Sequence, residues 1–317
     1  VAYRAGLALH GTAADYHTSG AWTAVGLAAA AGRMLGLDGE QIRHAMGIAE
    51  YHGPRSPMMR CIDHPTMLRD GVGWGAPTGV SAAYMAELGF TGAPALTIEG
   101  DDAAPWWGDL GERWEIMETH YKFHPVCRWA HPAIDGALAL MEEHGLRAAD
   151  VARVRIDTFH NATRLAGHEP KTLDEVSYGI AFPVAMAIVR GRIGLDELSP
   201  DVLKDSEILR ISRATELFDD DHLTKISVGK RWAAVTLFSR DGKEFTAAPR
   251  TPRGDPDDPL DEADFAEKYR LLAHPVIGAE RAGRIVEQAL RFDELPDGDF
   301  MALLDELYPP ACWPRAE

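Results

Sequence analysis

The sequence has few cysteines and none of the common nucleotide-binding or zinc-binding motifs. Its three cysteines, Cys61, Cys127 and Cys312, are scattered without a CxxC pair, and neither a Walker A nor a GxGxxG sequence occurs. The absence of these patterns removes support for structural zinc and for nucleotide binding. A sparse, odd number of cysteines fits reduced thiols better than a disulfide framework, so we expect a cytoplasmic protein.

Positive charge and long apolar runs are also scarce. The 317 residues include 32 Lys and Arg against 49 Asp and Glu, which gives a formal net charge of −17. Nucleic acid and anionic membranes need a basic surface, so neither is expected as a partner. The longest apolar run, residues 21–31, is interrupted by Thr23 and is too short to span a bilayer.

What is present is an ordinary globular composition, with 46% hydrophobic and 26% charged residues. In the first third, segments rich in Ala and Gly predict helices over residues 21–35 and 77–88. Between them, Asp38 followed by Gln41 resembles a capping box that opens a further helix. So many small residues on helices predict close contacts between the helices.

The rest of the chain mixes helices and strands. Residues 151–159 alternate as a strand, and residues 232–248 predict a β-hairpin around the Asp241-Gly242 turn. Residues 251–259, rich in Pro, Gly and Asp, predict a linker. Helices are predicted over residues 132–144, 176–190, 262–272 and 279–290.

This order predicts a mainly α fold in two parts. A discontinuous all-α helical domain would comprise residues 1–118 and 258–317. A smaller α+β lid domain would comprise residues 119–257. The C-terminal helices would pack back on the first ones.

The densest group of candidate functional residues lies between His120 and His131. The stretch contains no carboxylate and leads into a predicted helix, whose first N–H groups favour anions. It therefore predicts an anion site, although a basic surface strand is the alternative. The candidate side chains are Lys122, His124, Arg128 and His131.

Two further candidates lie in the first third. His17 precedes a helix and has the chemistry of a general acid or base, with a capping or core histidine as the alternative. The segment from Arg55 to Gly71 predicts a long non-helical connection that carries arginines and His64. It suits either a phosphate loop or close helix packing, and its spacing, which matches no phosphate motif, favours packing.

The end of the predicted strand 151–159 supplies the last candidates, His160 and Asn161. Side chains at a strand end often project into a cleft. Plain structural roles are the alternative for both.

The order of these motifs resembles the MmgE/PrpD family. The resemblance covers essentially the whole chain, and the ordered combination is specific although each motif alone is weak. The main matching stretches are Tyr16-His17-Thr18, Leu68-Arg69-Asp70-Gly71, Gly89-Phe90-Thr91-Gly92, Lys122-Phe123-His124-Pro125-Val126-Cys127-Arg128, His131-Pro132-Ala133-Ile134-Asp135, Phe182-Pro183-Val184-Ala185-Met186-Ala187 and Pro252-Arg253-Gly254-Asp255-Pro256.

The resemblance implies a helical domain plus an α+β lid, with the active site in the cleft between them. It also implies a homodimer that needs no cofactor or metal and acts on small di- or tricarboxylates. His17 and Lys122 would be catalytic. Arg69, where many members have Lys, would clamp a substrate carboxylate. The other implied substrate-binding residues are His124, Arg128, His131, His160 and Asn161.

The resemblance makes a hydro-lyase on a hydroxy-polycarboxylate, similar to 2-methylcitrate dehydratase, the first hypothesis for function. An epimerase or decarboxylase on the same kind of substrate is the alternative within enzymes. Family chains begin well before the segment that matches Val1. We therefore expect either an incomplete sequence or a partner that supplies the remainder, and a non-catalytic subunit is the rival from another class.

Overall fold

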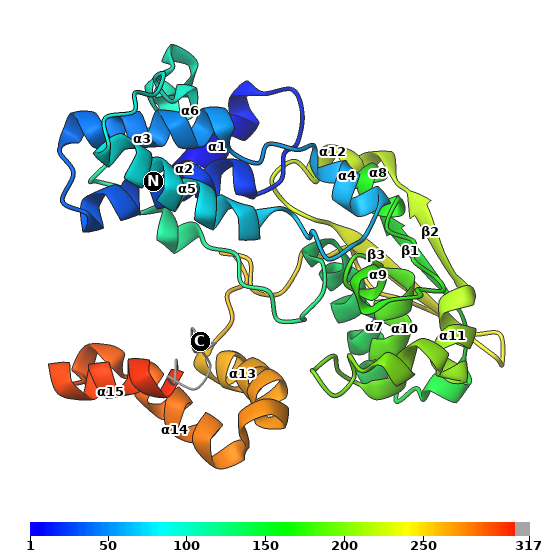
Figure 1. The fold of residues 1–317 in the computed structure, drawn as a ribbon. Helices are drawn as coiled ribbons and strands as arrows, with labels where there is room; N and C mark the ends of the chain where they lie inside the picture. The colour runs from blue at the N-terminus through cyan, green and yellow to red at the C-terminus, as the bar shows by residue number, and fades with distance from the viewer. Residues whose placement is uncertain (308–317) are drawn as a thin grey trace. The chain divides into compact units, whose positions relative to one another are not determined.

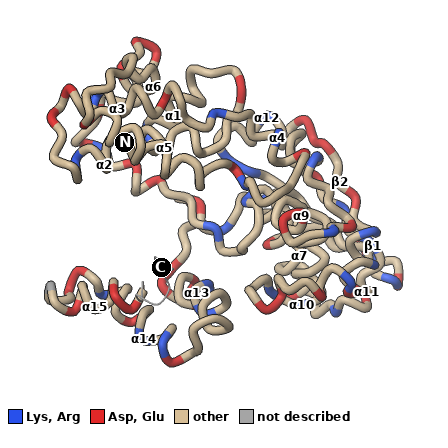
Figure 2. Tube along the Cα trace, in the orientation of Figure 1, with Lys and Arg blue, Asp and Glu red and all other residues tan. Residues whose placement is uncertain are grey.

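The computed structural model describes residues 1–307, and Cys312 lies outside them. The chain divides into two compact units, Val1–Thr119 and His120–Glu317, of which the second is described to residue 307. Helices dominate both units, as predicted, and Figure 1 shows the strands within the second. Figure 2 shows acidic residues spread along both units, consistent with the net charge of −17.

The first unit is built from helices. Its α-helices are α1 (Ala2–Thr12), α2 (Gly20–Met34), α3 (Gly39–His52), α4 (Met58–Asp63), α5 (Val72–Glu87) and α6 (Leu96–Glu99). The predicted capping box is confirmed at α3, where the Gln41 amide donates to Asp38 Oδ1 at 2.9 Å. In return the Asp38 amide donates to Gln41 Oε1 at 3.1 Å. Two backbone donors at this helix start are thus satisfied locally.

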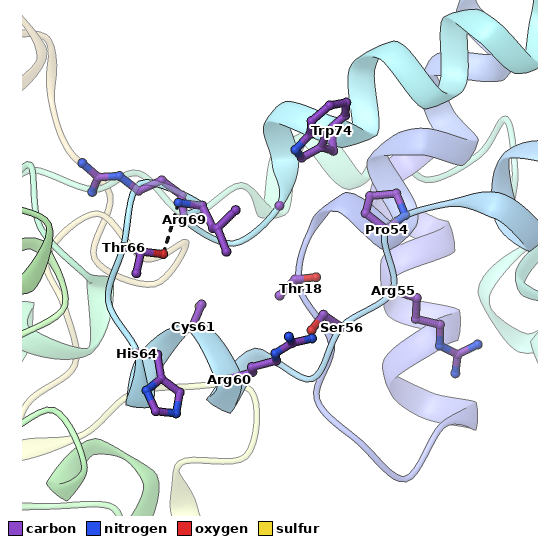
Figure 3. Close-up of a pocket in the computed structure, with 12 residues that line it drawn as sticks. Thr18, Pro54, Arg55, Ser56, Arg60, Cys61, His64, Thr66, Arg69 and Trp74 are labelled. Carbon is purple, nitrogen blue, oxygen red and sulfur yellow. Dashed lines mark hydrogen bonds between the residues drawn. The ribbon is translucent and has the colours of Figure 1, made fainter.

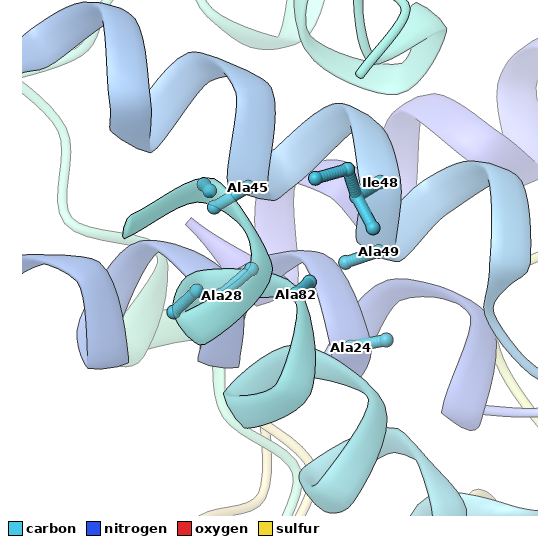
Figure 4. Close-up of a cluster of buried hydrophobic side chains, with 8 residues drawn as sticks. Ala24, Ala28, Ala45, Ile48, Ala49 and Ala82 are labelled. Carbon is cyan, nitrogen blue, oxygen red and sulfur yellow. The ribbon is translucent and has the colours of Figure 1, made fainter. Parts of the chain in front are cut away.

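Small residues form the core of this unit, as Figure 4 shows for the contacts among α2, α3 and α5. The buried cluster consists of Ala24, Ala28, Ala45, Ile48, Ala49, Ala82, Ala83 and Ala86. Glycines bring the backbones closer still. A Cβ added at Gly79 would lie 2.5 Å from the Ala24 carbonyl oxygen, and one at Gly47 would overlap the Ala93 carbonyl oxygen. The predicted close helix packing is confirmed.

Two sequence predictions in this unit are wrong. The connection between Arg55 and Gly71 was expected to be non-helical, yet it contains α4. Helix α5 begins at Val72, five residues before the predicted start, because Gly75 packs tightly against Thr23 of α2. Glycine usually argues against a helix interior. Here the close packing against α2 outweighs that preference.

Among the described residues, the second unit combines nine α-helices with four strands. Its helices within the described chain are α7 (His131–Glu143), α8 (His160–Thr163), α9 (Leu173–Ser177), α10 (Ala181–Arg190), α11 (Ser206–Arg213), α12 (Asp221–Ile226), α13 (Glu262–Ile277), α14 (Ala279–Ala289) and α15 (Asp297–Leu307), with a 3₁₀ turn at Arg128–Ala130. Its strands are β1 (Val151–Thr158), β2 (Thr215–Asp219), β3 (Ala233–Ser239) and β4 (Glu244–Thr246). Among residues 1–307, no helix is both long and apolar enough to cross a bilayer.

The four strands form one sheet in the order β2-β1-β3-β4. Strand β1 runs parallel to β2 and antiparallel to β3, and β3 pairs with β4 as the predicted hairpin. Along β1, Val154 and Ile156 are buried whereas Arg155 is exposed, so one face is covered. Helices α7, α10 and α11 contact β3, β2 and β1 respectively (Figure 1).

The predicted helix over residues 176–190 is in fact two helices, α9 and α10. Between them, the Ile180 amide donates to the Leu165 carbonyl at 2.7 Å and the Ala181 amide to the Ala166 carbonyl at 2.9 Å. These long-range bonds take the donors that a continuous helix would use.

The C-terminal helices belong to the second compact unit. The Leu195 amide donates to the Leu271 carbonyl of α13 at 3.2 Å, and Arg253 pairs with Asp264 at 2.6 Å. The assignment of residues 258–317 to a discontinuous helical domain stays a prediction.

Candidate functional site

The first unit contains a cavity of about 500 Å³ (Figure 3). It lies where α4, the segment that follows α4, and the first turns of α2 and α5 meet. Its lining residues are Thr18, Pro54, Arg55, Ser56, Arg60, Cys61, His64, Thr66, Leu68, Arg69, Gly71 and Trp74. The predicted clamp Arg69 is among them. The volume suits a small molecule.

The lining of this cavity is cationic. It includes Arg55, Arg60 and Arg69 together with His64, and no carboxylate is among these described lining residues. Figure 3 shows the Arg60 guanidinium next to Ser56, whereas those of Arg55 and Arg69 extend away from the middle of the cavity. Arginine side chains are long enough to turn toward an anion, which they bind through two parallel hydrogen bonds.

Two helix starts add to this positive potential. Thr18 lies just before α2, and Gly71 is the N-cap of α5. Neither helix has an acidic side chain in its first turn, so their free N–H groups are not neutralised locally. The starts are in close contact, since a Cβ added at Gly20 would lie 2.5 Å from the Gly71 carbonyl oxygen. Both dipoles therefore favour an anion in one region.

Thr18 has a hydroxyl that lacks a hydrogen-bond partner among the described residues. The residue is only 4% exposed, yet it lines the cavity. Leaving a buried hydroxyl unpaired costs about 1–3 kcal/mol. A ligand oxygen in the cavity would restore that bond.

The backbone at Arg69 is unusual. Its φ of 54° lies in the left-handed region, and it is the one residue other than glycine with positive φ in the described chain. Such a conformation costs about 1–2 kcal/mol for a residue with a side chain. Residues held this way cluster at functional sites. The turn is closed by a hydrogen bond from the Arg69 amide to the Thr66 carbonyl at 3.3 Å.

His17 is not among the residues that line the cavity. It is 7% exposed, and its Nε2 accepts a hydrogen bond from Arg55 Nε at 3.2 Å. Backbone pairing fixes this geometry, because the Thr18 amide donates to the Ser56 carbonyl at 2.8 Å. The structure therefore connects the predicted His17 and the cavity through Arg55.

Lys122 is exposed, at the start of the predicted basic stretch in the second unit. Its Nζ donates to the Val126 carbonyl at 3.2 Å. Lys268 of α13 in turn donates from Nζ to the backbone carbonyl of Lys122. Burial, and the nearby charge of Lys122, lower the pKa of Lys268. Two lysine side chains thus lie close together here.

His124 and His131 are both buried at this point. His124 Nε2 lies 3.0 Å from Asp135 Oδ1, and the two imidazole rings are 5.1 Å apart. Burial is the largest single influence and would raise the pKa of Asp135, but the hydrogen bond and charge of His124, the Arg253 amide and His131 together outweigh it, and the pKa is lowered. One polar atom of each residue, His124 Nε2 and Asp135 Oδ1, thus faces the other, and Asp135 Oδ2 accepts a hydrogen bond from the Arg253 amide at 3.2 Å.

Arg128 forms an ion pair with a carboxylate that sequence patterns assigned to a linker. Its Nη2 lies 2.6 Å from both oxygens of Asp255, and His120 Nδ1 lies 3.0 Å from Oδ1. Asp255 is 1% exposed, so this part of residues 251–259 is anchored in the unit. The guanidinium of Arg128 would have to leave Asp255, or share it, to bind substrate.

His160 and Asn161 lie in the short helix α8, directly after β1, and both are exposed. His160 Nδ1 is 2.6 Å from Asp219 Oδ2 of β2. Their substrate-binding role stays a prediction. Within the part of the chain that the structure describes, no group of three or more His, Cys, Asp or Glu side chains is arranged to hold a metal ion.

The burial of His131 has a consequence for stability. Desolvation, with a contribution from His124, lowers the pKa of His131 from 6.5 to about 3. Between these pH values the unfolded chain binds a proton that the folded chain excludes. The contribution of His131 to the free energy of unfolding is therefore fully present above pH 6.5. Below pH 6.5 the free energy of unfolding falls by about 1.4 kcal/mol per pH unit.

We expect urea unfolding of the second unit to show this decline between pH 6.5 and 4.5. In His131→Leu the free energy of unfolding should depend less steeply on pH, by the amount that corresponds to one bound proton. His222→Leu, at an exposed histidine of α12, serves as the control and should leave the slope unchanged. Equal slopes for His131→Leu and the unmodified protein would contradict this account.

The cationic cavity should also direct anionic reagents to its thiol. We compare the rate of reaction with anionic iodoacetate to the rate with neutral iodoacetamide. We expect this ratio of rates to be about 10-fold higher for Cys61 than for a small thiol in solution. The preference should fall as salt is added and in Arg60→Gln. Peptide mass spectrometry reads both thiols, and Cys127, whose pKa is raised by burial, should react slowly with either reagent. A salt-independent ratio at Cys61 would show that the arginines do not act on the cavity.

Sequence reasoning singled out Arg69 and His17 as site residues but did not assign Arg55, Arg60 or Thr18 to substrate binding. The signal was present in part, because the segment from Arg55 to Gly71 is rich in arginine and ends in glycines. What it lacked was the backbone pairing of residues 16–18 with 56–58, which brings these side chains to the start of α2.

Comparison with known proteins accounts for both units. Residues 1–105 match the family model of the MmgE/PrpD N-terminal domain, and residues 124–293 match that of the MmgE/PrpD C-terminal domain. A cis-aconitate decarboxylase-like protein of Aspergillus oryzae is 22% identical over 95% of this chain and 68% of its own length. The cis-aconitate decarboxylase of Homo sapiens is 22% identical over 91% of this chain and 62% of its own length.

A cis-aconitate decarboxylase of Aspergillus terreus is 23% identical over 89% of this chain and 63% of its own length. The chain therefore spans roughly two thirds of the length of these curated relatives. The two domain matches together cover most of the chain. The chain belongs to the MmgE/PrpD family.

Proposed function

We propose that this protein is a lyase that acts on a small di- or tricarboxylate. The observation that carries the proposal is the cationic cavity of the first unit, which is lined by three arginines, by two helix starts and by Thr18, whose hydroxyl has no partner among the described residues. In a protein with a net charge of −17, such a group of cations is a specific recognition device rather than a general property of the surface.

The chemistry of the cavity suits both reactions considered for the family. Decarboxylation breaks the bond to one carboxylate, which leaves as CO₂, and the electron pair moves onto a conjugated carboxylate until a proton reaches carbon. Dehydration removes a proton next to a carboxylate and releases hydroxide as water. In each case negative charge grows on a retained carboxylate, and fixed cations around it lower the barrier.

Decarboxylation is the first candidate, because the curated relatives are named as cis-aconitate decarboxylases. The dehydration expected from the sequence, on a substrate similar to 2-methylcitrate, is the second candidate, since a hydroxy-tricarboxylate presents the same anions. Lys122 stays the predicted proton carrier of the second unit. The homodimer and the cytoplasmic location also stay predictions.

The test is to incubate the natural full-length protein with cis-aconitate, 2-methylcitrate and citrate, following CO₂ release and proton NMR in D₂O. Release of CO₂ supports decarboxylation, and a new double bond without CO₂ supports dehydration. Deuterium exchange with inversion would indicate an epimerase. Binding without turnover would favour a non-catalytic subunit, and no effect on any of these acids by folded protein would overturn the proposal.

We expect Arg60→Met to lower kcat/KM about 100-fold, mainly through KM, because a charge-assisted pair with a substrate carboxylate is lost. Arg43→Met is the matched control. Arg43 lies on α3 outside the cavity and pairs with Glu99 at 2.7 Å, so its loss should change kcat/KM less than 2-fold. Equal effects of the two substitutions would show that the cavity does not bind the substrate.

A further inference from the structure

The contact between Arg55 and His17 determines where the proton of this histidine resides. Arg55 Nε lies 3.2 Å from His17 Nε2. A guanidinium has only N–H donors and stays charged at any pH at which the protein is folded. The imidazole must therefore accept this hydrogen bond, and Nε2 carries the lone pair. In the neutral ring the proton then lies on Nδ1.

The other ring nitrogen is left without a partner in the described part of the chain. His17 Nδ1 is buried and has no hydrogen-bond partner among the described residues. A donor in this state costs about 1–3 kcal/mol, which the fold would avoid if the proton could move to Nε2. Arg55 prevents that move. The result is a buried N–H whose acceptor is absent from the described chain.

We infer that Arg55 is a positioning residue that fixes His17 as the Nδ1–H tautomer, so that the neutral ring donates a hydrogen bond through Nδ1, and its Nε2 lone pair, held by Arg55, is not available as a base. The sequence led us to expect that His17 acts as a general acid or base, and hydrogen-bond donation through Nδ1 replaces that role. The link to turnover rests on the proposed lyase function, whereas the tautomer itself does not.

The geometry also explains why Arg55 is placed to serve both the histidine and the cavity. Arg55 is exposed and lines the cavity, whereas His17 is buried and does not line it. The pairing of residues 16–18 with 56–58 holds both backbones in register. An anionic ligand bound to Arg55 would therefore affect the ring of His17 directly, through the single hydrogen bond between Arg55 and His17.

The experiment is long-range proton–nitrogen NMR of the full protein labelled with ¹⁵N-histidine, with the His17 signals assigned by their loss in His17→Gln. We expect Nε2 to appear as an unprotonated nitrogen and Nδ1 as a protonated one. In Arg55→Met the pattern should reverse or average, and in Arg55→Lys, which keeps a donor, it should persist. Arg60→Met, at a cavity arginine without a contact to His17, should keep the original pattern.

Two results would overturn the inference: a protonated Nε2 in the unmodified protein, or an unchanged pattern in folded Arg55→Met. Neither NMR result depends on turnover. The experiment would therefore identify the tautomer of His17 even if the protein proved not to be a lyase. Where lyase activity is present, Arg55→Met should lower kcat about 10- to 100-fold with a smaller change in KM, and Arg55→Lys should restore part of it.

Discussion

Replacing Lys122 by methionine is expected to lower kcat of the proposed lyase reaction about 10²- to 10⁴-fold, the usual contribution of a positioned proton carrier. The amine is exposed but not loose, since its Nζ donates to the Val126 carbonyl at 3.2 Å. Lys268 holds the backbone carbonyl of the same residue. The first contact fixes the amine and the second fixes the backbone of the residue, and the amine keeps N–H groups for a substrate.

A second variant separates proton transfer from charge. Lys122→Arg keeps the positive charge but holds its proton too tightly to exchange it near neutral pH. If Lys122 carries a proton, Lys122→Arg should keep KM and lose kcat. If it only binds a carboxylate, Lys122→Arg should keep both. Lys171→Met, at an exposed lysine of the same unit, is the control, and an unchanged kcat in Lys122→Met would refute the proton-carrier role.

The largest expected loss of stability follows from Gly47→Ala. The added Cβ would overlap the Ala93 carbonyl oxygen, a backbone atom that cannot turn aside as a side chain can. We expect the first unit to lose about 3 kcal/mol, the cost of overpacking against a rigid neighbour. Because the chain has two units, amide hydrogen exchange of α3 is the appropriate measurement, and it should accelerate about 100-fold.

A glycine without such a neighbour supplies the control. A Cβ at Gly283, inside α14, would meet nothing within 4 Å. Gly283→Ala should therefore stabilise its helix by about 0.5–1 kcal/mol through the lower backbone entropy of the unfolded chain. If Gly47→Ala were also neutral or stabilising, the close approach of α3 to Ala93 would be wrong.

Local signals predicted the elements that depend on local chemistry. The capping box of Asp38 and Gln41, strand β1 and the hairpin of β3 and β4 are confirmed, because caps, alternation and turn residues are all read from neighbours in the chain. The mainly α class followed from the same signals. Membership of the MmgE/PrpD family, read from the order of the motifs, is also confirmed.

Features that depend on distant partners could not be predicted in this way. Strand β2 exists because it pairs with β1, and its five residues carry little pattern of their own. The break between α9 and α10 is made by carbonyls at Leu165 and Ala166. The role of Asp255 depends on Arg128, which lies 127 residues away in the chain. The cavity likewise needs the pairing of residues 16–18 with 56–58.

The same pairing of Arg128 with Asp255 marks where the chain enters and leaves the α+β region. The Tyr121 amide donates to the Gly254 carbonyl at 2.8 Å, so the two ends of this region meet side by side. A segment whose two ends lie next to each other can be replaced by the equivalent segment of a relative without displacing the flanking parts of the chain. Residues 121–254 are thus a natural unit for grafting between relatives, which would let the two halves of the protein be re-combined to ask which half chooses the substrate.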